Sequence, residues 1–179
     1  MPPPSPPLDA LAHPDWQAQD YVDSQAFSAV RFDPETHRLT LTCHFVGGDP
    51  HLSQGEVWFD LRYVAGLEDQ VPIDMSTTEI SVEVDVPSGF VGWESNPNGV
   101  QVFVKDHQWR SQYGGWVNIS HAGRHRASLR PTPAEIPEGA TEPGFDPTKI
   151  RSVGVKFGIG SGSTHEYVGE VYITDMTIT

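Results

Sequence analysis

The sequence contains one cysteine, Cys43, among 179 residues, so no disulfide can form within the chain. Basic residues are also scarce. Lys and Arg number 11 against 24 Asp and Glu, which gives a net charge of −13. A chain of this charge repels phosphate backbones and anionic lipid, so we expect neither nucleic acid nor a membrane surface as a partner. No apolar run approaches the roughly 20 residues that a membrane helix needs.

Helical periodicity is almost absent as well. Apolar and polar residues instead alternate in short runs, which clusters of Gly, Pro, Asn and Asp separate. This pattern is typical of a sandwich or barrel. The sequence therefore predicts an all-β, antiparallel β-sandwich with at least seven strands, over residues 38–45, 55–63, 79–86, 99–105, 116–119, 152–159 and 169–178.

The chain opens on MPPPSPPLDA, which has five prolines in its first seven residues. Proline at this density favours an extended, semi-rigid spacer between domains. The segment has neither the charged nor the apolar region of a signal peptide. We therefore expect a Pro-rich linker over residues 1–10 and one domain over residues 11–179, both part of a longer secreted protein.

Alternation also assigns side chains to the two faces of each strand. One set is apolar and forms the predicted core, in which Cys43 is a buried, inert thiol: Leu39, Leu41, Cys43, Phe45, Val57, Phe59, Leu61, Ile80, Val82, Val84, Val86, Val100, Val102, Val104, Val117, Ile119, Val153, Val155, Phe157 and Ile159. The opposite set mixes aromatic and polar residues: Thr42, His44, Trp58, Asp60, Arg62, Gln101, Phe103, Lys105, Trp116, Asn118 and Lys156.

Several segments in this order resemble a known family. They are VPIDMSTTEISVEVDVP (71–87), NPNGVQVFVKD (96–106) with the following HQWRSQYGGWVNIS, GFDPTKIRSVGVKFGIG (144–160) and YVGEVYITDMTI (167–178). Together they are similar to the galactose-binding-like β-sandwich carbohydrate-binding modules that are attached to bacterial mannanases, cellulases and related glycoside hydrolases. The likeness covers roughly residues 27–178, and it is carried by the order of the segments more than by any one of them.

The resemblance implies a jelly roll of two antiparallel sheets that binds β-glucan or mannan on a concave face without cleaving it. It also implies a covalently linked glycoside hydrolase domain and one structural calcium ion at the edge of the sandwich. The aspartate of the family's closing strand falls at Thr174 here, and Asp175 follows one place later on the other face. Asp175 is therefore the candidate metal ligand, displaced from the family's position.

The outward set has the chemistry that a sugar needs. A sugar ring offers C–H groups on one face and a rim of hydroxyls, so it binds flat aromatic surface and planar polar groups. Trp109 and Tyr113 lie in the segment HQWRSQYGG, where a rim residue can fold over a bound sugar. The predicted carbohydrate-binding residues are Trp58, Asp60, Arg62, Gln101, Phe103, Lys105, Trp109, Tyr113 and Trp116.

Other interpretations remain open. Trp58 and Trp116 can pack beneath the Pro-rich loop 130–145 as a second small core. Glycoside hydrolysis needs two carboxyl groups roughly 5 to 10 Å apart, for which the pairs Glu83 with Asp85 and Glu56 with Asp60 are candidates. His121 and His125 have the spacing of metal ligands only if they lie on a helix, which Gly123 disfavours. A sandwich that binds no sugar and supports a neighbouring catalytic domain is the remaining alternative.

Overall fold

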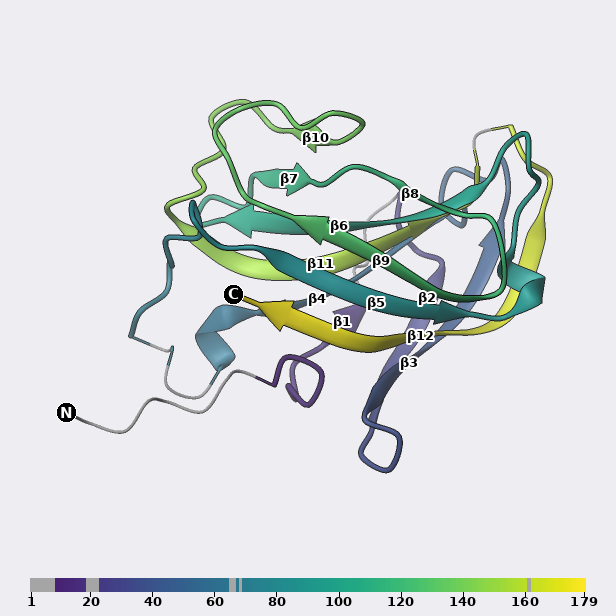
Figure 1. Cartoon of the computed structure of the whole chain (residues 1–179), viewed down its shortest axis with the longest axis horizontal. Helices are drawn as coiled ribbons and strands as arrows, with labels where there is room; N and C mark the ends of the chain where they lie inside the picture. The colour runs from purple at the N-terminus through teal and green to yellow at the C-terminus, as the bar shows by residue number, and fades with distance from the viewer. Residues whose placement is uncertain (1–8, 19–22, 65–66, 68, 161) are drawn as a thin grey trace.

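The structure is a computed structural model that describes residues 9–18, 23–64, 67, 69–160 and 162–179. Within these residues the regular secondary structure is almost all β-strand, and turns and loops connect the strands (Figure 1). The strands are β1 (Gln17–Ala18), β2 (Phe27–Asp33), β3 (Arg38–Val46), β4 (Gln54–Asp60), β5 (Ile80–Val86), β6 (Asn98–Asp106), β7 (Ser111–Tyr113), β8 (Val117–Ile119), β9 (Gly123–Leu129), β10 (Ala140–Thr141), β11 (Ile150–Gly158) and β12 (Glu166–Ile178). Two short 3-10 helices, η1 (Leu61–Tyr63) and η2 (Ser88–Phe90), follow β4 and β5.

The strands pair into two antiparallel sheets, which confirms the predicted β-sandwich. In the described part of the chain, one sheet has the order β1-β4-β11-β6-β7-β10, with β8 also paired to β6, and the other has the order β2-β3-β12-β5-β9. The long strands alternate between the sheets along the chain, from β3 to β4, β5 and β6 and again from β11 to β12. Successive long strands therefore enter opposite sheets, as in a jelly roll.

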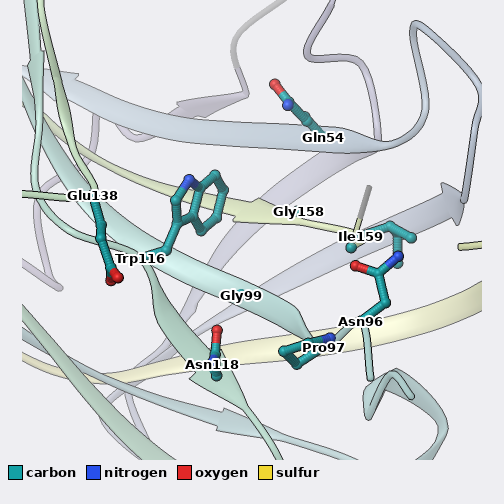
Figure 2. A pocket seen from close by; sticks show the side chains of 10 residues that line it. Gln54, Asn96, Pro97, Gly99, Trp116, Asn118, Glu138, Gly158 and Ile159 are labelled. Carbon is teal, nitrogen blue, oxygen red and sulfur yellow. The ribbon is translucent and has the colours of Figure 1, made fainter. Parts of the chain in front are cut away.

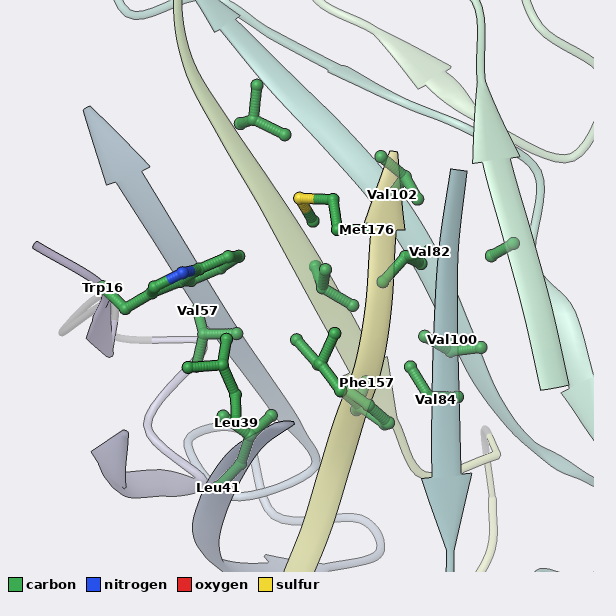
Figure 3. Close-up of a cluster of buried hydrophobic side chains, with 14 of the residues drawn as sticks. Trp16, Leu39, Leu41, Val57, Val82, Val84, Val100, Val102, Phe157 and Met176 are labelled. Atoms are coloured by element: carbon green, nitrogen blue, oxygen red, sulfur yellow. The ribbon is translucent and has the colours of Figure 1, made fainter. Parts of the chain in front are cut away.

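The core between the sheets includes the side chains that alternation predicted, together with others such as Trp16 and Met176 (Figure 3). All of the predicted core residues are buried except Val117, which is partly buried against the cluster. Cys43 lies among them, and burial raises the pKa of its thiol to about 12. The thiol is therefore protonated at neutral pH and inert, because the thiolate is the reactive form.

The sequence did not predict two strands at the edges of the smaller sheet. In β2 the burial pattern is irregular, and a register shift between Phe27 and Ala29 interrupts its pairing with β3. In β9 only Ala127 and Leu129 are buried, and the other side of the strand carries arginines. An edge strand with one weakly apolar face gives little periodic signal.

The packed domain begins no later than Ala10. This residue is 1 % exposed, and its carbonyl accepts a hydrogen bond of 2.7 Å from the indole Nε1 of Trp16. Residues 1–8 of the predicted linker lie outside the described residues. None of the described helices is long and apolar enough to span a membrane.

Leu41 tests the core. Its side chain is fully buried on β3, whereas Thr42, the next residue, is exposed. We expect Leu41→Ala to lower the free energy of unfolding by about 2 to 5 kcal/mol, because a buried leucine leaves a cavity. Thr42→Ala should change it by less than about 0.5 kcal/mol. Urea unfolding followed by tryptophan fluorescence measures both, and equal effects would contradict this core.

Candidate functional site

Most of the predicted binding residues share the outer face of the larger sheet. Strand β11 lies between β4 and β6, so that Gly154 is paired with Trp58 on one side and with Phe103 on the other. The remaining outward residues of β4 and β6 follow in the same register, and they are Glu56, Asp60, Gln101 and Lys105. The alternation therefore assigned these side chains to the correct face.

The centre of this face is covered, so the expectation of an open platform is wrong there. Gly154 has no side chain, and the Phe103 ring lies across it: a Cβ at residue 154 would come within 2.3 Å of the ring's Cζ. The Tyr113 ring packs on Phe103 with centroids 5.2 Å apart. Four predicted sugar ligands are buried, with at most 5 % of each exposed: Asp60, Gln101, Phe103 and Lys105.

Tyr113 belongs to this cover, although the sequence placed it in a loop at the rim. It lies in β7, and its hydroxyl donates a hydrogen bond of 2.7 Å to Oε1 of Glu56, which also lies 3.6 Å from Nζ of Lys156. Burial raises the pKa of Tyr113, and the charge of Glu56 raises it further. Burial also lowers the pKa of Lys156, although Glu56 opposes that shift. This network fixes Tyr113 across three strands.

One open end of the face carries Trp58, Arg62 and Trp109. Asp60 accepts hydrogen bonds from Arg62 at 2.9 Å and from Arg151 at 3.0 Å. The Arg151 guanidinium lies 3.8 Å from the centroid of the Trp109 ring, which also meets Trp58 edge-on at 5.8 Å. Trp109 is 40 % exposed, but its stacked face is occupied by Arg151. At this end the aromatic surface is already engaged by the protein.

At the opposite end of the face, Trp116 lies flat on the sheet. A Cβ at Gly99 of β6 would come within 2.8 Å of the Trp116 ring, and a Cβ at Gly158 of β11 within 3.0 Å. The indole therefore rests on two adjacent strands only because both positions are glycine. Glycine inside a strand marks such a close approach.

The Trp116 ring lines a cavity of about 470 Å³ (Figure 2). Amide and carboxylate side chains surround the indole in this view, and they come from segments far apart in the sequence. The Pro-rich loop 130–145 borders the ring through Glu138 without filling the cavity, so the predicted small core does not form over Trp116. The cavity is lined by Gln54, Asn96, Pro97, Gly99, Trp116, Asn118, Glu138, Gly158, Ile159 and Gly160.

Glu138 lies at the cavity in a backbone conformation that is unusual for its type. Its φ is +57°, in the left-handed region that favours glycine. The turn that contains it has Pro137 before it and closes with a hydrogen bond of 3.0 Å from the Gly139 N–H to the Ile136 carbonyl. A non-glycine residue in this region costs roughly 1 kcal/mol or more, and such strain is concentrated at binding sites.

The surroundings of Asp175 do not fit a calcium ion. Its carboxylate lies 4.0 Å from the Arg126 guanidinium, a cation that disfavours a metal ion beside it. The described residues contain no group of three or more His, Cys, Asp or Glu that could hold a metal. His121 and His125 stack with ring centroids 4.4 Å apart, and they lie beside β9 and on it, not on a helix. Calcium elsewhere stays a prediction, which a melting curve with and without chelator tests.

The sequence identified Trp116 and assigned Asn118 to the same face, but it missed Gln54, Asn96 and Glu138. These three residues come from other segments, and alternation along one strand cannot bring such segments together. Two glycines were the one feature of the sequence that indicated a close approach at this site. Gly99 and Gly158 both lie in strands of strong β character, next to valines and a phenylalanine, where glycine is otherwise unfavourable.

Comparison with known proteins gives structural likeness alone. No protein-family model matches the chain, and no curated protein matches it in sequence. Among solved structures, it is similar to PfGH50B, with a TM-score of 0.51 and 11 % identity over 92 % of this chain, and to the agarase AgWH50C, with a TM-score of 0.53 and 10 % identity over 97 %. A third solved structure, of carbohydrate-binding modules from the β-sandwich superfamily, has a TM-score of 0.47. The identity is 14 %, and the match covers 92 % of this chain and 57 % of the other chain.

This chain spans 22 % of PfGH50B and 24 % of AgWH50C. The fold it shares with them is therefore less than a quarter of each of those proteins.

The ion pairs of Asp60 should contribute to stability in a pH-dependent way. Burial alone would raise the pKa of Asp60, but the hydrogen bonds from Arg62 and Arg151 outweigh it and lower the pKa. A carboxyl whose folded pKa is lowered contributes stability above its unfolded value of about 4, and this contribution disappears as the pH falls through the folded value. Asp60→Asn should cost about 3 kcal/mol at pH 7, because Arg151 loses its charged partner.

Urea unfolding of parent and variant from pH 7 to pH 2 measures the difference. The difference in unfolding free energy between the parent and Asp60→Asn should narrow as the pH falls below about 4. Asp85→Asn on β5, a half-buried aspartate outside this cluster, is the matched control. If the difference in unfolding free energy stays constant with pH, the charge of Asp60 is not its cause.

Proposed function

We propose that this domain is a non-catalytic carbohydrate-binding module and that its sugar-binding site is the Trp116 cavity. The observation that carries the proposal is the indole itself. It packs closely over Gly99 and Gly158 and lines a cavity whose rim carries amides and a carboxylate. The sheet holds the ring in the orientation in which a sugar would stack, so little conformational entropy is lost on binding.

The polar residues at the rim of the cavity can form hydrogen bonds with the hydroxyl groups of a sugar. Gln54, Asn96 and Asn118 each carry an amide that both donates and accepts, and Glu138 can accept two hydrogen bonds. Hydroxyl groups at the edge of a pyranose ring offer the complementary donors and acceptors. Stacking thus supplies apolar contact, and the rim supplies orientation.

The proposed ligand is a β-linked plant cell-wall polysaccharide of the mannan or β-glucan type. The order of the sequence segments that resemble galactose-binding-like modules supports this choice. The similarity to the agarase AgWH50C adds agarose to the polysaccharides worth testing.

The environment of the candidate acid pairs supports a role without catalysis. Glu56 is 2 % exposed and is bound to Tyr113 and Lys156, so it does not face a cleft. The lowered pKa of Asp60 makes it a poor general acid near neutral pH. Glu83 binds two arginines on the outer face of the smaller sheet.

We further propose that the domain is secreted and is linked covalently to a glycoside hydrolase domain. The Pro-rich start of the sequence and the small share of PfGH50B and AgWH50C that this fold represents support that arrangement. The alternative, a sandwich that only supports a catalytic domain, predicts no affinity for any soluble polysaccharide. The same experiment therefore distinguishes the two.

Affinity gel electrophoresis tests the proposal with galactomannan, glucomannan, mixed-linkage glucan, xyloglucan, xylan and agarose. At least one neutral polysaccharide should retard the parent domain. Trp116→Ala should weaken that binding by about 1 to 3 kcal/mol, roughly 5- to 150-fold, because the stacking surface is lost. Trp116→Tyr, which keeps an aromatic ring, should retain part of the affinity.

Trp109→Ala is the matched control, since it removes a half-exposed tryptophan from the other end of the same face. It should be retarded like the parent. Melting curves of all variants establish that each is folded. If Trp109→Ala loses binding and folded Trp116→Ala keeps it, the site lies at the Arg151 end instead, and retardation by none of the polysaccharides would favour the supporting role.

A further inference from the structure

A second cavity, of about 340 Å³, lies beside the Trp116 cavity. Its lining is Gly92, Trp93, Glu94, Pro97, Asn118 and Ser120. Two of these residues, Pro97 and Asn118, also line the Trp116 cavity, so the two hollows share a wall. On this ground we infer that they form one groove that binds consecutive residues of a neutral polysaccharide chain, an inference that rests on the proposed function.

The spacing along β8 supports a ligand longer than one sugar. Trp116, Asn118 and Ser120 alternate along residues 116–120, which include β8, and they line the two cavities in that order. Four residues of extended chain span roughly 13 Å. This length exceeds one pyranose ring, so a single terminal sugar would leave one of the two cavities empty.

Trp93 supplies the second aromatic surface, and the structure holds its loop in place. Its side chain is 50 % exposed, while its carbonyl accepts a hydrogen bond of 3.0 Å from the N–H of Asn96. Asn98, fully buried nearby, donates to the Phe90 carbonyl at 2.6 Å and accepts from the Gly160 N–H at 3.2 Å. A half-exposed indole on an anchored loop beside a cavity is suited to stacking.

The charges at the groove select against anionic sugars. Glu138 lines the Trp116 cavity and Glu94 lines the Trp93 cavity, and among the described residues that line either cavity there is no Lys or Arg. A uronate or sulfate ester in the groove would meet one of these carboxylates, and Lys156, whose Nζ lies 5.9 Å from the centroid of the Trp116 ring, already pairs with Glu56. Neutral chains therefore fit both cavities better than anionic ones.

Isothermal titration calorimetry tests chain recognition with mannan, β-glucan and agarose oligosaccharides, from disaccharide to hexasaccharide. The association constant should rise with length at least as far as the tetrasaccharide. Trp93→Ala should weaken tetrasaccharide binding about 5-fold or more, as expected for one lost stacking ring, and leave disaccharide binding unchanged. Trp116→Ala should weaken both, and Trp109→Ala neither.

Equal affinity for the disaccharide and the hexasaccharide would overturn the inference while leaving the proposed function intact. The inference would also be overturned if folded Trp93→Ala bound the hexasaccharide with the same affinity as the parent. Loss of the proposed function has a different signature, namely that the parent binds no saccharide or that Trp116→Ala binds every length as the parent does.

Charge selection has its own measurement. Hydroxyethyl cellulose and carboxymethyl cellulose share a backbone and differ in charge, so electrophoresis in both compares a neutral and an anionic chain. The carboxymethyl form should bind the parent more weakly, and the double variant Glu94→Gln with Glu138→Gln should reduce that difference. A parent that prefers the carboxymethyl form, or a variant with an unchanged difference, would contradict selection by these carboxylates.

Discussion

Three glycines inside paired strands decide how the outer face of the larger sheet is built. Side chains normally stand away from a sheet, and a ring can lie flat on it only where the neighbouring strand has no Cβ in the way. Gly154 admits the Phe103 ring in this way, and Gly99 with Gly158 admit that of Trp116. Glycine in a strand costs roughly 0.5 to 1 kcal/mol relative to alanine, which the apolar area buried by each ring offsets.

The rings placed by these glycines divide the face into regions with different chemistry. Phe103 and Tyr113 close its centre, and they shield Glu56 and Lys156, which lie 3.6 Å apart while Glu56 also accepts a hydrogen bond from the tyrosine hydroxyl. At one end Arg151 occupies the stacking surface of Trp109. The other end keeps a flat aromatic surface open to a cavity, and this difference is why we assign sugar binding to Trp116 and not to the aromatic residues of the whole face.

The sequence predicted the sandwich well because the core strands are regular. Period-2 alternation in segments such as Val82, Val84 and Val86 assigns each side chain to the interior or the exterior, and the interior set was confirmed. The edge strands β2 and β9 were missed because their buried faces are irregular or short.

For the candidate site, alternation predicted the correct side of the sheet but not the segments that cover it. Alternation places Gln101 and Lys105 on the outer face, yet both are buried, since residues of the separate strand β7 and of other segments cover that face. Three polar residues around Trp116, namely Gln54, Asn96 and Glu138, come from separate segments that only the tertiary fold brings together. The glycines carried the missing information, because a glycine within a strand indicates that a ring or another chain approaches closely.

Nuclear magnetic resonance of the indole N–H groups tests the central claim most directly. The protein has five tryptophans, so five such resonances report on separate positions in the molecule. Titration with the oligosaccharide that binds best should shift the Trp116 indole signal and the Gly99 and Gly158 amide signals, while the Trp58 and Trp109 indole signals stay in place. Shifts confined to Trp58 and Trp109, with Trp116 unchanged at saturation, would contradict the assignment of sugar binding to the Trp116 cavity.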